Sequence, residues 1–391
     1  MTESNAPFSE SEERRALRKA VAELGRKYGR DYFNAAYREG RKTTELWEEA
    51  GKLGYLGVAV PEEYGGGGGE IGDLAAVCEE LAAAGCPLLL MVVSPAIVGT
   101  IIAQYGTEEQ KQRWLPGLAD GTSTFAFSIT EPDAGSNSHR IITTAHREED
   151  GGWRLTGGKT FISGVDEASH VLVVARTADH KTGNLKPALF LVPTDTPGFT
   201  WQEIPMGIVS PEKQFTLFFD DVRLPHDALI GSEDAGIEQL FAGLNPERIM
   251  AASFATGTAR LALELATAYA KDRQVWKTPI GAHQAIAHPL AQTHIEIELA
   301  RLMTQKAAAL YAAGDHMGAG EAANMAKYAA GEVVCAAVDR AIQTHGGNGL
   351  AEEYGLVQML AGSRLSRIAP VSREMVLNFV AQFSLGLPKS Y

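Results

Sequence analysis

The sequence predicts an α+β protein made of three successive regions: a helical region over residues 1–122, a β-rich region over 123–232 and a second helical region over 233–391. Three observations predict this order. Apolar residues recur at helical spacing in the first region, short β-branched runs alternate with Gly, Pro and Asp turns in the second, and long alanine- and leucine-rich segments fill the third. A chain of 391 residues is also too long for one ordinary core, so two or three domains are expected.

The first region is expected to hold one long N-terminal helix and four shorter ones. Leu17, Val21 and Leu24 fall at helical spacing in the long helix. Thr107, followed by two glutamates, is a typical helix start because its hydroxyl can accept a hydrogen bond from a free backbone N–H. The four shorter helices are expected at about 43–53, 73–84, 94–105 and 107–119.

A glycine-rich stretch in this region, residues 67–72, formally matches the GxGxxG pattern of dinucleotide-binding loops. Such a site also needs an acidic residue about 20 positions later. Residues 88–94 read LLLMVVS and supply none. The better interpretation is a surface loop.

The middle region predicts a sheet. No helical period lies between its runs, which argues against a parallel α/β arrangement and favours a sandwich or barrel. Turns such as residues 150–152 (Asp-Gly-Gly) separate the runs. The expected strands are 123–130, 140–147, 153–156, 159–163, 170–176, 187–192 and 214–222.

The last region predicts an antiparallel helical bundle, from the length and spacing of its apolar segments. Pro246 is expected to kink or restart the first helix, because proline lacks the backbone N–H that the helix ladder needs. The expected helices are about 234–272, 282–313, 318–344, 351–361 and 370–385.

Composition excludes several classes of protein. A net charge of −13 and a pI near 5.3 disfavour a nucleic-acid or anionic-membrane partner. The longest apolar run is too short to span a bilayer. Three cysteines without metal-type spacing, together with a polar N-terminus, favour a cytoplasmic protein with reduced thiols. The ten histidines form no tight ligand cluster, so no metal site is expected.

Two segments of the β region carry residues suited to a flat ligand. In FSITEPDAGS (127–136), Thr130 and Ser136 lie where a β-branched run turns, and their hydroxyls can donate and accept hydrogen bonds. In GGKTFISG (157–164), Phe161 can stack on a ring while Ser163 bonds its edge. The alternatives are an ordinary polar turn and a strand with a core phenylalanine.

The C-terminal region carries further candidates. Arg273 follows a helix and could bind a phosphate bidentately, or could complement the helix dipole. The glycines of QTHGGNG (343–349) allow close approach of a ligand, or form a simple helix C-cap. Glu247 lies beside Arg248 just after Pro246, and by itself a helix glutamate is more often solvated than functional.

Together, and in this order, the motifs resemble the acyl-CoA dehydrogenase family over nearly the whole chain. The resemblance implies a helical N-terminal domain (1–122), a central β-barrel (123–232) and a C-terminal four-helix bundle (233–391), usually assembled as a tetramer of two dimers. The motifs are PEEYGG (61–66), TEPDAGS (130–136), GGKTFIS (157–163), FDDVRLP (219–225), Arg273 and QTHGGNG (343–349).

The resemblance also implies FAD, with the flavin ring between the β domain and the C-terminal bundle. Thr130 matches a threonine that bonds the ring edge, Phe161 replaces a tryptophan beside the ring, and Ser163 replaces a threonine near N5. Arg273 and Gln343 match residues that reach across the dimer to the diphosphate. The FAD-binding candidates are Phe127, Ile129, Thr130, Ser136, Phe161, Ile162, Ser163, Arg273, Trp276, Gln284, Gln343, Gly346 and Gly347.

The reaction implied is α,β-dehydrogenation of an acyl-CoA thioester to the trans-2-enoyl-CoA, with electrons passed to an electron-transfer flavoprotein. The usual base position corresponds here to Pro370, which carries no acid–base group. The isovaleryl-CoA dehydrogenase branch places its base on the first long C-terminal helix, where Glu247 matches it. Glu247 is therefore the expected base. The substrate-binding candidates are Ser136, Asn245, Arg248, Pro370 and Val371.

Pro370 has a second consequence. In the family, the backbone N–H at this position donates to the thioester oxygen, and proline has no N–H. Either the Val371 N–H takes over or this donor is missing. An alternative function therefore stays open, namely a non-oxidative flavoprotein such as a C–S lyase on the same scaffold.

Overall fold

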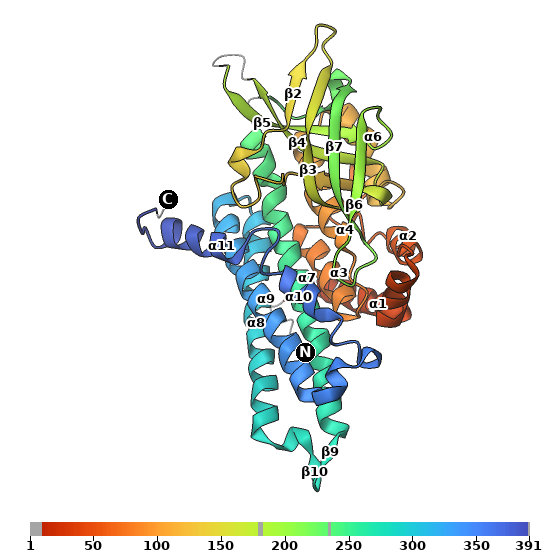
Figure 1. Ribbon diagram of the computed structural model, residues 1–391, viewed down its shortest axis with the longest axis vertical. Coiled ribbons are helices and arrows are strands. Elements are labelled where there is room, and N and C mark those ends of the chain that lie inside the picture. Colours follow the sequence, from red (N-terminus) through yellow and green to blue (C-terminus); the bar gives the residue numbers. More distant parts are fainter. Residues whose placement is uncertain (1–9, 179–182, 234–235, 390–391) are drawn as a thin grey trace.

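A helix of 37 residues, α7 (Gly236–Asp272), runs from the β region to the opposite end of the elongated molecule (Figure 1). The computed structural model describes residues 10–178, 183–233 and 236–389. Antiparallel to α7 lies α8 (Gln284–Ala312), and α9 (His316–His345) returns beside both. Two short helices, α10 (Met359–Leu365) and α11 (Arg373–Phe379), end the bundle.

Small side chains bring α7 and α9 close together. The buried face of α7 repeats alanine every three or four residues, which places one small stripe along a single side of the helix. Alanines of α9 face it, so the helix backbones can approach closely. The buried alanines of α7 in this stripe are Ala252, Ala255, Ala259, Ala262 and Ala266.

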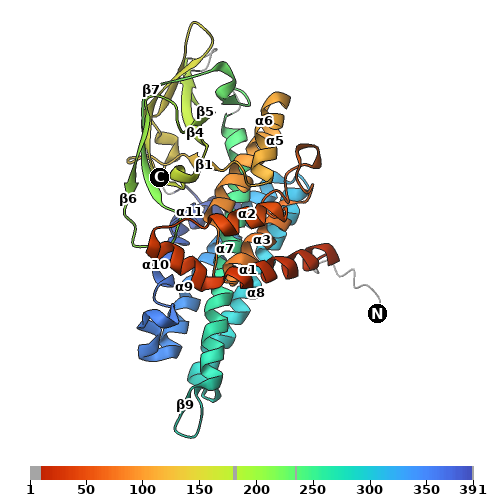
Figure 2. The same ribbon diagram turned by 90° about the vertical axis from the view of Figure 1, so that its right-hand side faces the viewer.

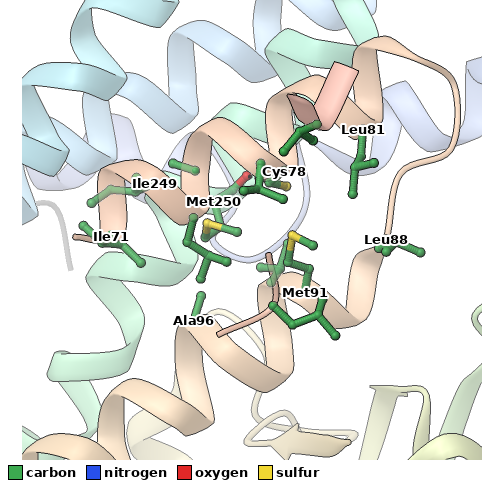
Figure 3. Close-up of a cluster of buried hydrophobic side chains, with 14 of the residues drawn as sticks. Ile71, Cys78, Leu81, Leu88, Met91, Ala96, Ile249 and Met250 are labelled. Atoms are coloured by element: carbon green, nitrogen blue, oxygen red, sulfur yellow. Dashed lines mark hydrogen bonds between the residues drawn. The ribbon is translucent and has the colours of Figure 1, made fainter. Parts of the chain in front are cut away.

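The N-terminal helices pack across the upper half of α7. A shared apolar core joins α3 to α7 and to the segment that contains Met91 (Figure 3). The helices are α1 (Glu12–Glu39), α2 (Thr44–Lys52), α3 (Ile71–Ala83), α4 (Leu89–Met91), α5 (Thr100–Tyr105) and α6 (Glu108–Ala119). Thr107 caps α6 as the sequence predicts, because its hydroxyl accepts from the Gln110 N–H.

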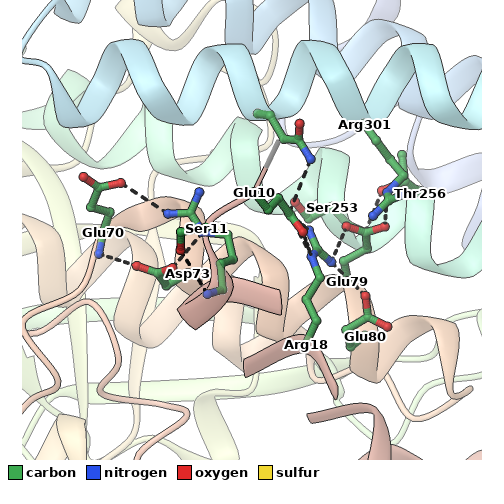
Figure 4. A network of polar contacts seen from close by, with 12 residues as sticks. Glu10, Ser11, Arg18, Glu70, Asp73, Glu79, Glu80, Ser253, Thr256 and Arg301 are labelled. Carbon is green, nitrogen blue, oxygen red and sulfur yellow. Dashed lines mark hydrogen bonds and ion pairs between the residues drawn. The ribbon is translucent and has the colours of Figure 1, made fainter. Parts of the chain in front are cut away.

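A buried ionic network ties the same helices together (Figure 4). Arg18 of α1 reaches Glu79 of α3 at 2.8 Å, and Arg301 of α8 reaches the same carboxylate at 2.7 Å. Arg260 of α7 pairs with Glu79 and Glu80 at 2.9 Å. Since buried charges are tolerated only when they are paired, this network fixes how α1, α3, α7 and α8 sit relative to one another.

The β region forms one sheet of eight strands, in the order β6-β7-β3-β2-β4-β5-β8, with β1 paired parallel to β4. One face of β4 and β5 packs on the helices and the other faces the interior of the β region, so both strands are buried on both sides. The strands are β1 (Phe125–Ser128), β2 (Thr144–Arg147), β3 (Trp153–Ser163), β4 (His170–Ala178), β5 (Leu185–Pro193), β6 (Phe199–Ile204), β7 (Gln214–Leu224) and β8 (Leu229–Ile230).

Some expected elements differ from the observed ones. The two runs 153–156 and 159–163 form one strand, β3, with irregular register at Leu155/Gly157 and Lys159/Ile162. The helix α7 runs through Pro246, so a restart of the helix there, one of the two expected effects of this proline, was wrong. The segment 351–361 is a short 3₁₀ turn followed by the start of α10, because Gly355 adopts a left-handed conformation between them.

One strand was not expected, and one expected helix has different bounds. Strand β6 was missed because only one of its six residues is buried, which leaves little alternation to detect. The helix expected at about 94–105 begins earlier, and its Val92–Gly99 stretch is π-helical around Pro95. Among the helices that the structure describes, none combines the length and the apolar run needed to cross a membrane.

Candidate active site

The loop after β1 is held directly against β3. The backbone N–H of Thr160 donates to the Thr130 carbonyl at 2.9 Å, and Glu131 and Ala134 pair with each other across the turn. The motifs 130–136 and 157–163, which lie far apart in the sequence, therefore form one surface. Phe127 is buried beneath it, Ile129 and Thr130 are half-buried, and Ser136 is exposed.

A buried ion pair fixes this loop from below. Lys159 donates to Glu131 Oε1 at 2.9 Å and to the Ile129 carbonyl at 3.0 Å. The Glu131 carboxylate also accepts from the backbone N–H groups of Ile142 and Thr143. Burial lowers the pKa of Lys159 to about 8, although Glu131 opposes this shift. Thr130 is thus held between two residues that are both anchored by Lys159.

Phe161 is presented outward by a strained backbone. Its φ of 57° lies in the left-handed region, which is unfavourable for an aromatic residue, and its side chain is 58% exposed. Such strain is retained where the surroundings impose it, often at binding sites. Ile162 is buried next to it, and Ser163 Oγ lies 2.9 Å from Gln214 Nε2 of β7. The arrangement offers a flat apolar surface beside a polar edge.

The remaining FAD-binding candidates lie at the other end of the bundle. Trp276 is 92% exposed, with φ 64°, in the turn between β9 (Gln274–Val275) and β10 (Thr278–Pro279). Figures 1 and 2 place this hairpin at the end of the molecule opposite the sheet. All six candidates of this group are exposed: Arg273, Trp276, Gln284, Gln343, Gly346 and Gly347.

The turn that ends α9 is rigidly supported. The ring of His345 stacks on Tyr269 with centroids 4.1 Å apart, and Asn348 Nδ2 bonds the hydroxyls of Tyr269 and Tyr354 at 3.1 Å each. A Cβ added to Gly346 or Gly347 would meet nothing within 4 Å, so this backbone is open to a ligand. The candidates of this turn and of the hairpin thus lie apart from those of the β region within one chain.

Glu247 lies half-buried on α7, and within the described part of the chain its carboxylate makes no hydrogen bond or ion pair. Burial raises the pKa of Glu247 to about 7, while the nearby charges of Arg248 and Lys327 act to lower it. A carboxylate with this pKa, partly open to a ligand, can accept a proton near neutral pH.

Arg248 and Asn245 support the helix around Glu247. The Arg248 guanidinium donates to the Leu244 carbonyl at 3.0 Å and to Asn245 Oδ1 at 3.4 Å, and its Nε is buried without a hydrogen-bond partner. Asn245 Nδ2 donates to the His316 carbonyl at the start of α9.

Sequence reasoning missed Lys327. This residue of α9 is 3% exposed, and its ammonium donates to the carbonyl of Val371. Pro370 and Val371 are half-buried. A signal that could have found Lys327 is its position in AANMAKYAAGE (322–332), where a lysine shares a helix face with buried alanines. The structure thus joins α7, α9 and the 370–371 segment at one place.

Three family models match the chain: the acyl-CoA dehydrogenase N-terminal domain over residues 11–122, the middle domain over 126–222 and the C-terminal domain over 234–385. The acyl-CoA dehydrogenase FadE12 of Mycobacterium tuberculosis (strain H37Rv) is 64% identical over 388 residues, which cover 99% of this chain and 100% of that protein. The chain belongs to the acyl-CoA dehydrogenase family.

Solved structures of acyl-CoA dehydrogenases share the fold. Butyryl-CoA dehydrogenase from Megasphaera elsdenii is 29% identical, with a TM-score of 0.89 and coverage of 96% of this chain and 99% of that one. Glutaryl-CoA dehydrogenase from Mycobacterium smegmatis in complex with FADH2 is 27% identical, with a TM-score of 0.89 and coverage of 99% and 98%. The predicted family and fold are therefore confirmed.

This acyl-CoA dehydrogenase is an FAD-dependent oxidoreductase. The residues present suit the cofactor: Phe161 offers an exposed ring, Gly346 and Gly347 offer an open backbone, and Arg273 offers an exposed guanidinium of the kind that binds phosphate.

Proposed function

We propose that this acyl-CoA dehydrogenase removes the α-proton of an acyl-CoA thioester with Glu247 and yields the trans-2-enoyl-CoA. The observation that carries the proposal is the half-buried Glu247 carboxylate with its pKa raised to about 7. Pro370, at the position where most of the family carries a base, has no acid–base group. Bound FAD would supply the acceptor for the hydride that leaves Cβ.

The other residues near Glu247 have distinct roles in this proposal. Arg248 is fixed by Leu244 and Asn245, and its charge lowers the pKa of Glu247, which favours the ionised base. Asn245, Pro370 and Val371 form the surroundings of the acyl thioester. Ser136, exposed on the loop after β1, meets the acyl-CoA or the cofactor at the rim.

The cofactor is proposed to bind between two copies of the chain. One copy supplies the surface of the β region, namely Phe127, Ile129, Thr130, Ser136, Phe161, Ile162 and Ser163. A second copy supplies Arg273, Trp276, Gln284, Gln343, Gly346 and Gly347. The support is that these groups lie at opposite ends of one chain and that the second group is exposed. We propose a homotetramer of two dimers.

Two further parts of the proposal concern its cellular setting. The electron acceptor is an electron-transfer flavoprotein, as the family resemblance implies. The location is cytoplasmic, in keeping with three free cysteines, of which Cys78 and Cys86 are buried.

We also propose domain limits of 1–122, 123–232 and 233–391.

One observation favours a second candidate. Pro370 lacks the backbone N–H that would stabilise negative charge on the thioester oxygen, and losing one such donor typically costs about 10²-fold or more in rate. A non-oxidative flavoprotein, such as a C–S lyase whose reaction does not remove a proton next to a thioester carbonyl, would not need this donor.

The test is single-turnover bleaching of the purified flavoprotein by a panel of straight, branched and dicarboxylic acyl-CoA thioesters. The proposal expects at least one thioester to bleach the flavin absorbance and to appear as its enoyl-CoA. Conversion of a thioester without bleaching supports the non-oxidative candidate. Protein that binds FAD but is bleached by no acyl-CoA contradicts dehydrogenation.

A further inference from the structure

Lys327 is an unusual residue for its position. It is 3% exposed on α9, and within residues 10–178, 183–233 and 236–389 it forms no ion pair. Its ammonium group donates a hydrogen bond to the backbone carbonyl of Val371. A buried cation without a carboxylate partner is costly, and such groups concentrate at functional sites.

The carboxylates nearest to Lys327 are already engaged elsewhere, apart from Glu247. Glu332 pairs with Arg367 at 2.8 Å and with Arg373 at 3.4 Å, and Glu374 pairs with Arg373 at 3.3 Å. Glu332 and Glu374, together with Glu247 and Arg248 on α7, are charges that act on Lys327. Of these three carboxylates, only that of Glu247 has no ion-pair partner within the described residues.

The Val371 residue is anchored on two sides. Lys327 holds its carbonyl, and the next residue, Ser372, caps α11 by accepting from the Met375 N–H. None of the hydrogen bonds given for the described part of the chain uses the Val371 N–H. A fixed backbone donor that is not otherwise engaged is what a thioester oxygen requires.

We propose that Lys327 is a positioning residue of the dehydrogenation site: it holds Val371 so that the Val371 N–H bonds the thioester oxygen, replacing the donor that Pro370 lacks. The inference rests on the proposed function. Lys327 also opposes the rise in the pKa of Glu247 that burial causes, because its positive charge favours the carboxylate over the acid. One side chain thus couples the oxyanion donor to the base.

Two substitutions separate these effects. Lys327→Met removes the hydrogen bond and the charge, whereas Lys327→Gln keeps an N–H donor and removes only the charge. Arg301→Met is the matched control, because it removes a cation of the ionic network on α8, away from the proposed site. For each holoenzyme, FAD content, the Kd of the best acyl-CoA and the single-turnover bleaching rate are measured from pH 5.5 to 9.

We expect Lys327→Met to retain FAD and to bind acyl-CoA with a similar Kd, while bleaching about 10²-fold more slowly, as misplacement by an ångström can cause. Its rate should also rise at higher pH than that of the wild type, because the pKa of Glu247 increases. Lys327→Gln should recover part of the rate and keep the shifted pH profile. Arg301→Met should lower Tm, and it should change neither the bleaching rate nor its pH profile.

Wild-type rates with an unshifted pH profile in the Lys327 variants overturn the inference. If Lys327→Met does not fold, Lys327→Gln decides, since a purely structural role predicts no change in its pH profile. If no acyl-CoA bleaches the wild-type enzyme, the proposed dehydrogenation is rejected. If the wild-type enzyme is bleached and the Lys327 variants are unaffected, only the inference about Lys327 is rejected.

Discussion

The ammonium nitrogen of Lys159 lies 2.9 Å from Glu131 Oε1, and both side chains are almost completely buried. This pair links the strand that carries Phe161 to the loop that carries Thr130. The Glu131 carboxylate also accepts hydrogen bonds from two backbone N–H groups of the segment before β2. The two proposed flavin-contacting segments are therefore held in one fixed arrangement before any cofactor binds.

Replacing Lys159 with Met should be severely destabilising. The change leaves the Glu131 carboxylate buried without its cation, which typically costs about 3–5 kcal/mol. Tm and FAD retention should fall together, as followed by thermal unfolding and by the ratio of flavin to protein absorbance. Lys213→Met is the control: its pair with Glu203 is 2.8 Å long but largely exposed, so Tm should stay close to that of the wild type. Equal behaviour of the two variants would show that the buried pair has no special role.

Replacing Glu247 with Gln should abolish the base and preserve the shape of the site. Flavin bleaching by the best acyl-CoA should slow by roughly 10²-fold or more, while FAD content and folding stay intact. Adding Pro370→Glu should restore part of the rate, because that position serves as the base elsewhere in the family. Wild-type bleaching by Glu247→Gln would reject Glu247 as the base.

The raised pKa of Glu247 also makes a prediction about stability. Its pKa is about 7 in the folded protein and near 4.5 when exposed, so the folded state binds the extra proton between these values. The resulting stabilisation is complete below pH 4.5 and is lost as pH rises through 7. The Tm of Glu247→Gln minus that of the wild type should therefore increase from pH 5 to pH 8. Glu264→Gln, an exposed glutamate on the same helix, should show a constant difference; a similar trend in both variants would assign the effect to general charge.

Arg273 should be needed for cofactor retention in a neighbouring copy of the chain. Arg273→Ala should weaken FAD binding by about 10- to 100-fold, since a bidentate charge-assisted partner of the diphosphate is lost. Lys277→Ala, in the same exposed hairpin, should bind FAD like the wild type. Both affinities can be measured by fluorescence of released flavin.

Co-expression distinguishes a shared site from a site within one chain. Phe161→Ala and Arg273→Ala affect different half-sites, so mixed assemblies should contain sites in which neither substitution is present, and bleaching should partly return. If mixtures are no more active than the separate variants, or if a stable monomer keeps FAD, the site does not span two copies.

The order of α, β and α regions could be predicted because each has its own hydrophobic period. The limits of individual elements depended on contacts that the period does not show. The glycines 157–158 suggested a break between strands, yet β3 continues through them. Only glycine fits at position 157, because a Cβ there would meet Thr143 at 2.6–2.8 Å. Pro246 did not interrupt α7, which is packed along its length by α3 and α9.

The candidate site was predictable where it rests on local motifs. Thr130 and Phe161 come together because the Thr160 N–H, within β3, donates to the Thr130 carbonyl, just after β1. Lys327 was not predictable in the same way. Its role depends on a carbonyl 44 positions later in the chain and on a charge on another helix, and neither relation leaves a periodic trace in the sequence.

The alanine stripe of α7 has a consequence for how the enzyme tolerates change. Since Ala252 and Ala255 are buried where α7 faces α9, they set the spacing between the helices that carry Glu247 and Lys327. A larger side chain there acts as a wedge, and the cost of overpacking falls on alignment between the two helices as well as on stability. Two of the smallest side chains in the protein, which have no proposed contact with substrate or cofactor, therefore limit how far Glu247 and Lys327 can shift relative to each other.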